Sequence, residues 1–256
     1  MLSDTIAQCI FIQKAVMLRV YDFFDDSIVV LSSRDFEFDA ILLSAIDEVW
    51  DKEQERRGKK LFNGKILSAI EHSNKEIKTI IVDYKHYLAK KTNPELFQFL
   101  NIIPVAVSGL LECKDGFVFG KRSDNVTQDA GNWELVPSGG IDCANVKFGF
   151  PVDFKNQLLV ELKEEVGIDK NSVKSINTFC YILDESSLVL DIGISLYCDL
   201  DANSIESSYS KLPVKEYDQL SFIKRDDLSS FFMENSKHFV EVSRMLLTRY
   251  LGKTIF

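Results

Sequence analysis

The segment from residue 132 to residue 168 constrains the fold more than any other part of this chain. An extended run through Trp133 leads to Gly139 and Gly140, where the missing Cβ lets the backbone turn sharply and approach a ligand closely. Further on, apolar residues recur at helical spacing until Gly167, a residue type that ends many helices. The segment therefore predicts a strand, a glycine turn and a helix.

Three glutamates lie on that helix. Glu161, Glu164 and Glu165 are separated by helical spacings, so they project from one side, beside an apolar stripe. The stripe consists of Leu158, Leu162 and Val166. Like charges this close repel one another, and the C-terminal end of a helix is unfavourable for anions. Mg²⁺ would relieve both effects, because it takes carboxylate oxygens and also accepts phosphate oxygens. The pattern indicates a Mg²⁺ site, the alternative being a solvated helix face.

Together, the glycines and the glutamates resemble the signature of the Nudix hydrolase superfamily. In that signature a glycine-containing loop leads into a helix reading Arg-Glu-apolar-any-Glu-Glu-any-Gly-apolar, and residues 160–168 here read Val-Glu-Leu-Lys-Glu-Glu-Val-Gly-Ile. The preceding strand is similar to the family pattern Trp-x-Leu-Pro-Gly-Gly. The matching residues are Trp133, Leu135, Pro137, Gly139 and Gly140, with Val136 as an insertion and Ser138 as a replacement. The resemblance implies an α/β/α sandwich with a mixed sheet, and a metal-dependent hydrolase.

The chain departs from this signature in two places. Val160 stands where the family has arginine, and the loop between Gly140 and Glu161 is longer than the standard one, so the first glutamate of the signature has no clear counterpart. In the family, that arginine and that glutamate support the metal-binding face as a pair. Their joint loss indicates a remodelled loop, for which Asp142 and Asp153 are candidate replacement acids. We expect Val160 to pack against neighbouring apolar groups.

A narrower resemblance covers most of the chain. Scattered positions look like the two-domain UDP-glucose diphosphatases of the Nudix superfamily, which also have a lengthened loop and lack the arginine. These positions are Trp50, residues 61–65, Tyr84, residues 87–89, residues 104–109 and residues 120–123. The resemblance implies Mg²⁺-dependent hydrolysis of UDP-glucose to UMP and glucose 1-phosphate, with Mn²⁺ as a substitute ion. The alternatives are hydrolysis of ADP-ribose, a dinucleotide or coenzyme A, and a sensor that binds a nucleotide without cleaving it.

The same resemblance assigns roles to individual residues. Glu161 and Glu165 are the first choices as metal ligands, Glu164 is the third and the Gly140 carbonyl is the fourth. Lys121 and Arg122 are expected to neutralise phosphate oxygens, the alternative being a solvated position at the end of a strand, and Gly139 and Gly140 are expected to bind substrate. The family's general base is a glutamate beyond the signature, for which Glu216 and Glu206 are the candidates, and Glu165 itself is expected to be essential for catalysis. His72, His86 and His238 have no partners at catalytic spacing, so each is expected to have a structural role.

Composition limits the other classes of function. A formal net charge of −9 argues against a broad nucleic-acid surface, although a metal ion can still bring a diphosphate to an acidic site. The five cysteines, at positions 9, 113, 143, 180 and 198, show neither zinc-site spacing nor a disulfide framework. The apolar N-terminal stretch is interrupted by Gln13 and Lys14, and we expect neither secretion nor a membrane span. A nucleotide-sized substrate and a cytoplasmic location fit best, and the oligomeric state stays open.

The periodicity predicts two units, an N-terminal α+β domain over residues 1–102 and a Nudix domain over residues 103–256. In the first unit we expect a helix at 38–57, strands at 8–20, 27–32, 65–72 and 76–83, and a helix start at Asn93 and Pro94. In the second we expect a strand from Pro104, a hairpin turn at 114–116, strands at 175–183, 188–200 and 220–224, and helices at 226–234 and 236–251. Residues 201–219 are polar and are expected to form a connection. The N-terminal unit is expected to border the substrate site.

Overall fold

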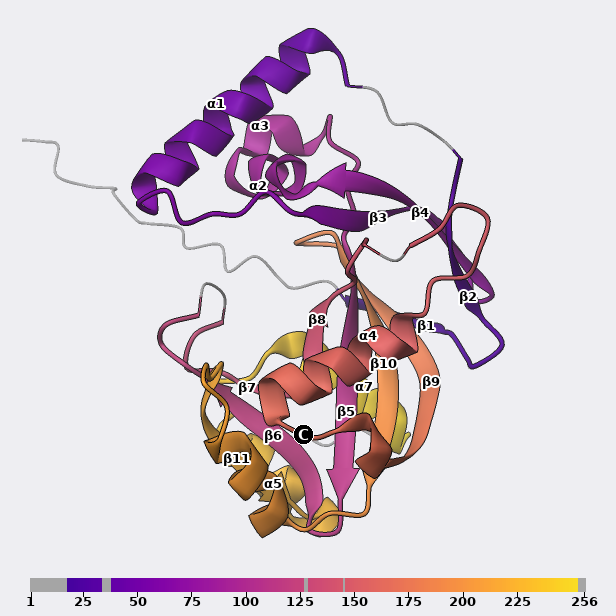
Figure 1. Cartoon of the computed structure of the whole chain (residues 1–256), viewed down its shortest axis with the longest axis vertical. Coiled ribbons are helices and arrows are strands. Elements are labelled where there is room, and N and C mark those ends of the chain that lie inside the picture. The colour runs from indigo at the N-terminus through magenta and orange to yellow at the C-terminus, as the bar shows by residue number, and fades with distance from the viewer. Residues whose placement is uncertain (1–17, 34–37, 127–128, 145, 253–256) are drawn as a thin grey trace, which may run out of the picture.

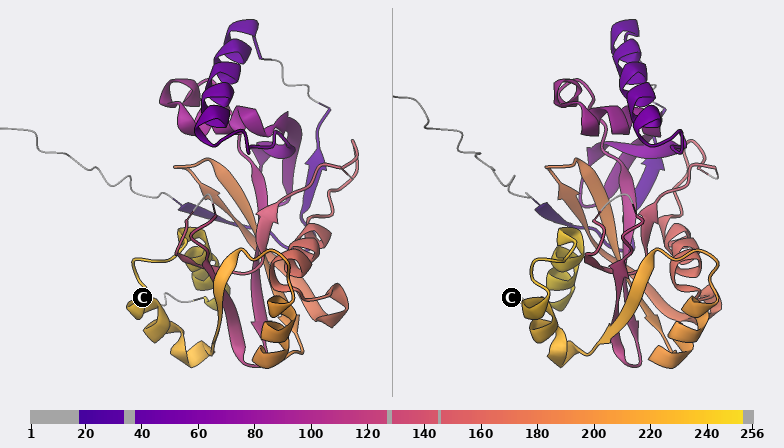
Figure 2. Two further views of the ribbon diagram at one scale, coloured as in Figure 1. Left: turned by 60° about the vertical axis from the view of Figure 1, so that its left-hand side comes forward. Right: turned by 90° about the vertical axis from the view of Figure 1, so that its left-hand side faces the viewer.

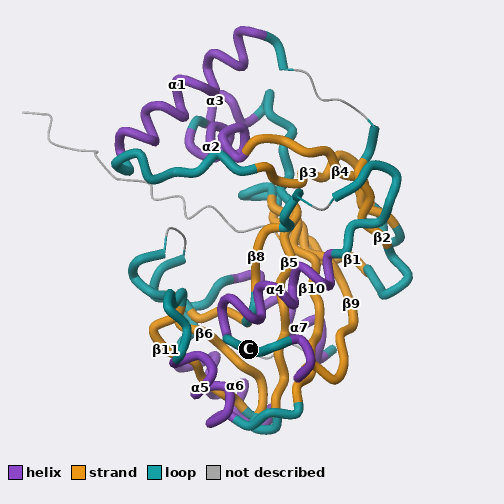
Figure 3. The backbone as a smooth tube through the Cα atoms, in the orientation of Figure 1, coloured by secondary structure: helices purple, strands orange, loops and turns teal. Residues whose placement is uncertain are grey.

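A computed structural model describes residues 18–33, 38–126, 129–144 and 146–252. In this part of the chain the strands form two sheets (Figure 1). The smaller sheet has three strands, in the spatial order β2 (Ile28–Leu31), β4 (Glu76–Asp83) and β3 (Lys65–His72). Three helices gather on the side of β3 and β4 that faces away from the large sheet (Figure 3). They are α1 (Ala40–Arg56), α2 (Tyr84–Thr92) and α3 (Pro94–Phe97).

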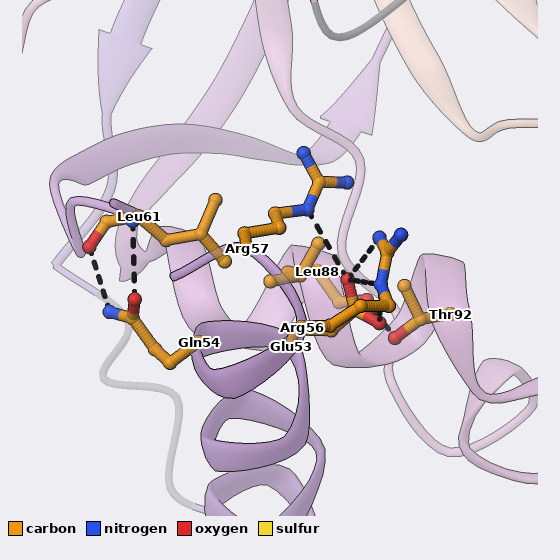
Figure 4. A network of polar contacts seen from close by, with 7 residues as sticks. All are labelled: Glu53, Gln54, Arg56, Arg57, Leu61, Leu88 and Thr92. Atoms are coloured by element: carbon orange, nitrogen blue, oxygen red, sulfur yellow. Dashed lines mark hydrogen bonds and ion pairs between the residues drawn. The ribbon is translucent and has the colours of Figure 1, made fainter. Parts of the chain in front are cut away.

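Helix α1 is fixed by polar contacts at both ends. Asp39 caps its start, accepting a hydrogen bond from the Leu42 amide at 2.8 Å. Near its end, the Gln54 side chain bonds both backbone groups of Leu61, and Arg56 and Arg57 both pair with Glu53 (Figure 4). The bonds between Gln54 and Leu61 tie the helix to the segment that enters β3.

The larger sheet contains eight strands among the described residues, and it is mixed. Its main order is β1-β9-β10-β5-β6-β11, in which β5 runs parallel to β10 and the other pairs are antiparallel, while β7 pairs with β6 and β8 with β5. The bounds are β1 (Leu18–Asp22), β5 (Val105–Cys113), β6 (Gly116–Arg122), β7 (Trp133–Leu135), β8 (Ser138–Gly140), β9 (Val173–Asp184), β10 (Val189–Cys198) and β11 (Tyr217–Ile223).

Helices cover both faces of this sheet. On one face lie α4 (Phe154–Glu161) and the π-helix η1 (Leu162–Val166), whose buried side chains Leu158, Leu162 and Val166 pack in the largest apolar cluster. On the other face α7 (Glu241–Leu251) packs Leu246 and Leu247 in a second cluster, and Figure 2 shows α4 and α7 on opposite sides of the strands. The expected α/β/α arrangement, preceded by a smaller α+β unit, is therefore what the structure shows.

The two sheets are joined by direct contacts. The Ala69 amide donates to the Ile103 carbonyl at 2.8 Å, and the Ile103 amide donates to the Ser68 hydroxyl at 2.9 Å. His72 Nδ1 lies 2.8 Å from the Tyr181 hydroxyl, which connects β3 to β9. Strand β1 belongs to the large sheet, where Leu18 pairs with Asp184, so the chain passes through the large sheet before it forms the small one.

Most expected elements are present, and the differences have local causes. The strand expected at 8–20 is seen only from Leu18, and residues 8–17 lie outside the described part. Helix α2 follows β4 without a break, because Asp83 and His86 form a capping box at its start.

Further along the chain the corrections concern the C-terminal third. The polar segment 201–219, for which no helix was expected, contains one: Asp201 caps α5 (Ala202–Ser210), which buries Ile205 and Tyr209 on one side. Strand β11 starts at Tyr217 and not at 220. The expected helix at 226–234 is seen as a short 3₁₀ turn, η3 (Arg225–Asp227), followed by α6 (Leu228–Glu234). The helix expected from 236 begins only at Glu241, since residues 238–240 pair with Trp133 of β7.

Among the described residues, none of the helices combines the length and the apolar character that a membrane span requires. The four cysteines in this part of the chain, Cys113, Cys143, Cys180 and Cys198, are all free thiols.

Candidate functional site

A cavity of about 570 Å³ opens where the large sheet splays between β5 and β6. Its floor is made by small residues of β5 and β8, including Ala106, Ser108 and Gly140. The first residues of α7 form one wall, and acidic residues from several elements line the space. These residues are Asp129, Glu134, Glu161, Glu165, Asp184, Asp191, Glu216 and Glu241. The cavity therefore has the size of a small-molecule site and a strongly acidic lining.

Two of the motif glutamates, Glu161 and Glu165, line this cavity, and the helix changes type between them. Helix α4 ends at Glu161 and continues as the π-helix η1, after which Gly167 adopts a left-handed conformation with φ of 78°. A π turn holds more residues than an α turn, so each residue rotates less about the axis and the residue three positions ahead falls further short of a full turn. Glu161 and Glu165 line the large cavity, whereas Glu164 lines two smaller ones.

Gly139 is in direct contact with Glu161. A Cβ at Gly139 would lie 2.4 Å from both Cδ and Oε1 of Glu161, so the glycine allows the carboxylate to lie against the backbone of β8. At Gly140, by contrast, an added Cβ would have nothing within 4 Å. Gln157 Nε2 donates to Glu161 Oε1 at 2.8 Å and holds the carboxylate from the other side.

Glu165 is held by two donors although it is only 5% exposed. Its Oε2 accepts hydrogen bonds from the Tyr217 hydroxyl at 2.7 Å and from the Ser138 amide at 3.1 Å. The Tyr217 hydroxyl also interacts with Glu134, a second buried carboxylate, which pairs with Arg122. A chain of polar contacts thus runs from Arg122 through Glu134 and Tyr217 to Glu165.

The start of β11 is fixed by Tyr209 of α5. The Tyr209 hydroxyl donates to the Tyr217 carbonyl and accepts from the Tyr217 amide at 3.2 Å. Both backbone groups of Tyr217 are bound by one side chain, which fixes the Tyr217 ring and places Glu216 at the cavity. Helix α5, unexpected from the sequence, is therefore part of the support of the site.

Burial and mutual repulsion raise the pKa values of the carboxylates. The pKa of Glu161 is raised to about 7, first by burial and then by Glu164 and Glu216, against the hydrogen bond from Gln157. Burial also raises the pKa of Glu165 well above its usual value, with Glu216 and Glu134 adding to it and Tyr217 opposing it. The pKa of Glu134 is raised to about 7 by burial, although Arg122 lowers it. A nearby cation would stabilise the ionised forms of all three.

The donor set fits a hard divalent cation. Glu161 and Glu165 offer carboxylate oxygens in one cavity that Gly140 also lines, which matches the preference of Mg²⁺ for few protein oxygens with water and phosphate in the other positions. Within the described part of the chain, no three acidic, histidine or cysteine side chains lie close enough to form a complete metal cage on their own. Substrate and water oxygens would have to complete the coordination.

Glu164 lies with the candidate replacement acids around a second cavity of about 360 Å³. Its lining includes Asp142, Asp153 and Val160. Asp153 caps α4 by accepting from the Asn156 amide, and Asp142 accepts from the Ala144 amide, so both have local structural roles. The expectation that Val160 is packed among apolar groups is wrong: it is 39% exposed and lines this open cavity.

The remaining candidates divide between the cavity and the surface. Arg122, Gly139, Gly140 and Glu216 line the large cavity. Lys121, which pairs with Trp133 and Gln219 in the sheet, is absent from its lining. Glu206 is exposed on α5 and also lies outside the lining.

Several residues of the cavity were not foreseen. Strand alternation could have indicated Glu134, since it must point away from the apolar Trp133 and Leu135 on either side. Asp191 could have been noticed as a single acid inside the apolar run 188–194. Tyr217 gave no signal, because its role depends on α5 and on the fold of the whole chain.

Among the described residues before Ala106, only Leu18 appears in the lining of the large cavity. The small sheet and its helices contribute no lining residue from the described part. Helix α2 nevertheless approaches one end, where Tyr87 interacts electrostatically with Asp191 and Asp184, and where Val189 packs against the cluster that contains Tyr87.

No family model matches the chain, and no curated protein matches it. Solved structures do resemble it in fold. A bifunctional NMN adenylyltransferase/ADP ribose pyrophosphatase from Francisella tularensis is 16% identical, over 66% of this chain and 48% of that one, with a TM-score of 0.43. The MutT protein from Methanosarcina mazei Go1 is 19% identical, over 58% and 92%, with a TM-score of 0.38. A Nudix hydrolase from Nitrosomonas europaea is 13% identical, over 59% and 90%, with a TM-score of 0.37. At these values the likeness carries no evidence about activity, which depends on the side chains of the cavity.

Proposed function

We propose that this protein is a Nudix-type diphosphatase that hydrolyses a nucleoside diphosphate linked to another group, with the help of Mg²⁺ or Mn²⁺. The observation that carries the proposal is the meeting of Glu161 and Glu165 in one cavity, with the first carboxylate lying against Gly139 and the second held by Tyr217. Stability alone would not select this arrangement, because the buried carboxylates repel one another. A bound cation and a phosphate substrate would account for the arrangement of these carboxylates.

In this proposal Glu161 and Glu165 hold the cation with the Gly140 carbonyl, and Glu164 is the predicted further ligand. When bound, the ion would neutralise charge on the diphosphate and lower the pKa of the attacking water. The Arg122 guanidinium, in the wall of the same cavity, adds positive charge on the side of Glu134.

The exposed Glu216 is the better candidate for the general base. Its carboxylate lines the cavity next to the fixed Tyr217, so it is placed to accept a proton from a water that attacks phosphorus. Glu206 would need a rearrangement of α5 to reach the same space. Lys121 would likewise have to change its position to contact a phosphate.

The substrate we propose first is UDP-glucose, cleaved to UMP and glucose 1-phosphate. The support is the similarity of the scattered N-terminal positions and the lengthened loop to two-domain UDP-sugar diphosphatases, together with a cavity large enough for part of a nucleotide sugar. We place the reaction in the cytoplasm, where the free thiols of the described chain would stay reduced. ADP-ribose, dinucleotides and coenzyme A are the competing substrates.

A panel of diphosphates tests the proposal. UDP-glucose, ADP-ribose, a diadenosine polyphosphate and coenzyme A would each be incubated with the protein and Mg²⁺, and the products identified by ion-exchange chromatography. We expect UMP and glucose 1-phosphate from UDP-glucose, and no reaction after chelation of the metal. If another compound is cleaved rapidly and UDP-glucose stays intact, the substrate assignment changes but the proposed diphosphate hydrolysis stands.

A sensor that binds a nucleotide without cleaving it is the second candidate. The observation that favours it is the position of Glu164 outside the large cavity, which leaves the described residues without a group of three metal-binding side chains. In that case every diphosphate of the panel would bind in the presence of Mg²⁺, as measured by calorimetry, and none would be cut.

A further inference from the structure

The large cavity has a second polar end, on strand β10. Asp191 pairs with Ala106 of β5, and Ala106 pairs with Gly140 of β8, so the three residues form one row across the sheet. Adjacent strands are about 4.8 Å apart, which places the backbones of Asp191 and Gly140 roughly 10 Å from each other. This is a suitable distance between a diphosphate at the glycine turn and the group attached to it.

Asp191 is held in a defined position. Its Oδ1 accepts a hydrogen bond from the Ser108 hydroxyl at 3.0 Å, and both side chains lie on the face of the sheet that α7 covers. Gly193, two residues further along β10 on the same face, is in close contact with Leu246 of α7, which confirms the orientation of the strand. Among the described residues, Ser108 is the hydrogen-bond partner found for Asp191, and it occupies Oδ1 alone. Oδ2 keeps its capacity to accept a bond at the cavity.

The neighbours of Asp191 favour one kind of ligand. Asp184 and Ser187 also line this end, with the Asp184 carboxylate already bound by Ser186 and Ser187 of the turn after β9. Two carboxylates repel a further phosphate or another anionic group. A hydroxyl can donate to a carboxylate and accept from a serine, so a neutral group with several hydroxyls satisfies both kinds of side chain.

We infer that Asp191, positioned by Ser108, binds a hydroxyl of a polyhydroxylated group on the diphosphate substrate, either the attached sugar or the ribose of the nucleoside. The inference rests on the proposed function and narrows its substrate class. In this inference the acidic end of the cavity favours substrates that carry hydroxyls there and disfavours substrates that carry a second anionic group. Buried acceptors of this kind discriminate strongly, because a ligand without the hydroxyl leaves the acceptor unpaired.

The test compares Asp191→Ala and Asp191→Asn with the wild type on three probes. These are UDP-glucose, UDP with a methyl group in place of the sugar, and UDP-glucose with a 2′,3′-dideoxyribose. The matched control is Asp199→Asn, which changes an exposed acid just after β10 that pairs with Lys114. We expect Asp191→Ala to raise KM for UDP-glucose roughly tenfold or more, with the Asn variant in between and the control unchanged.

The comparison of probes identifies the group that Asp191 binds. If Asp191 binds the sugar, the effect of Asp191→Ala should vanish for the methyl compound and persist for the dideoxy compound. If Asp191 binds the ribose, the effect should vanish for the dideoxy compound and persist for the methyl compound. An equal loss on all three probes would mean a structural role and overturn the inference. Tighter binding of CDP-choline than of UDP-glucose would overturn it too, because the acidic end would then select a cation.

The two proposals fail in different ways. If the wild type cleaves UDP-glucose and Asp191→Ala matches it on all probes, the inference fails and the proposed function stands. If the wild type cleaves neither these probes nor the other diphosphates of the panel, the proposed function fails, and calorimetric affinities for the three probes then decide about Asp191. Absence of both cleavage and binding by the wild type would overturn both.

Discussion

The Tyr217 hydroxyl donates a hydrogen bond to Glu165 Oε2 at 2.7 Å. The tyrosine is 1% exposed and the glutamate 5%, so neither has ready access to bulk water. Tyr217 comes from β11 and Glu165 from η1, and the bond therefore connects the helix that bears the motif to the strand that bears the candidate base, Glu216. This contact fixes the orientation of the proposed metal ligand before any ion binds.

Tyr217→Phe should weaken metal binding while it keeps the ring that fills the core. Loss of the donor raises the pKa of Glu165 further, so a larger fraction of it is protonated at neutral pH and unavailable to a cation. We expect a roughly 10- to 100-fold rise in the Mg²⁺ concentration needed for half-maximal activity. Tyr197→Phe, which changes a partly exposed tyrosine of β10, is the control. An unchanged Mg²⁺ dependence would show that the bond to Tyr217 does not tune Glu165.

Two neighbouring glycines provide a matched pair of substitutions. Gly139→Ala forces the Glu161 carboxylate to move, because the new Cβ would lie 2.4 Å from its Cδ, whereas Gly140→Ala meets nothing within 4 Å. Displacing a ligand by about 1 Å can cost ~100-fold in rate, so we expect kcat to fall by that order in the first variant and little in the second. Circular dichroism would verify that both are folded. Equal activities in the two variants would argue against Glu161 as a ligand.

The stability of the protein should depend on pH through Asp191. Its pKa is raised to about 6 by burial, so the folded state binds this proton more tightly than the unfolded state does. The stabilisation from the proton is fully present below the usual value of 3.8 and is lost as the pH rises through about 6. Asp191→Asn has no such loss.

Relative to the wild type, the Asn variant should therefore gain free energy of unfolding between acid and neutral pH. We expect a gain on the order of 1–2 kcal/mol, reduced from the full linkage value because the side chain borders a water-accessible cavity. Urea denaturation of both proteins in the absence of metal, at pH ~4 and ~7.5, measures this difference. Parallel pH profiles for the two proteins would show that Asp191 is not desolvated in the folded state.

Val160→Arg should change neither activity nor stability by much. Val160 is 39% exposed and does not line the large cavity, so the arginine can extend into solvent next to Glu164 and Asp142 without burial of an unpaired charge. We expect a change in unfolding free energy within about 0.5 kcal/mol and an unchanged kcat. A clear increase in turnover would indicate that the site has been degraded by loss of the arginine. It would contradict the view that the site has been remodelled to work without it.

Local patterns predicted the parts of the site that depend on neighbours in sequence. The spacing of Leu158, Leu162 and Val166 gave the buried face of the helix, and Gly167 gave its end. The change to a π-helix after Glu161 has no such local mark, and Glu164 lines a different cavity from the other two glutamates. Of the three glutamates expected on one face of the helix, two therefore line the large cavity and one lies outside it.

Other parts depend on contacts between distant segments. Glu134 and Tyr217 are far apart in the chain, and only the pairing of β6 with both β7 and β11 brings them together. Helix α5 was missed because its sequence is polar overall, although Ile205 and Tyr209 are spaced as one buried side of a helix. Asp191 reaches the cavity through the parallel pairing of β10 with β5, a long-range contact that periodicity does not reveal.

Turnover of UDP-glucose by the wild type and by Glu165→Gln, measured side by side with Mg²⁺ and after chelation, tests the central claim most directly. Gln keeps the size of the side chain and removes the ligand charge, so the fold should persist while the rate falls by ~100-fold or more. The predicted result is equimolar UMP and glucose 1-phosphate from the wild type, only when the metal is present. A Gln variant as active as the wild type, or turnover that survives chelation, would contradict the account.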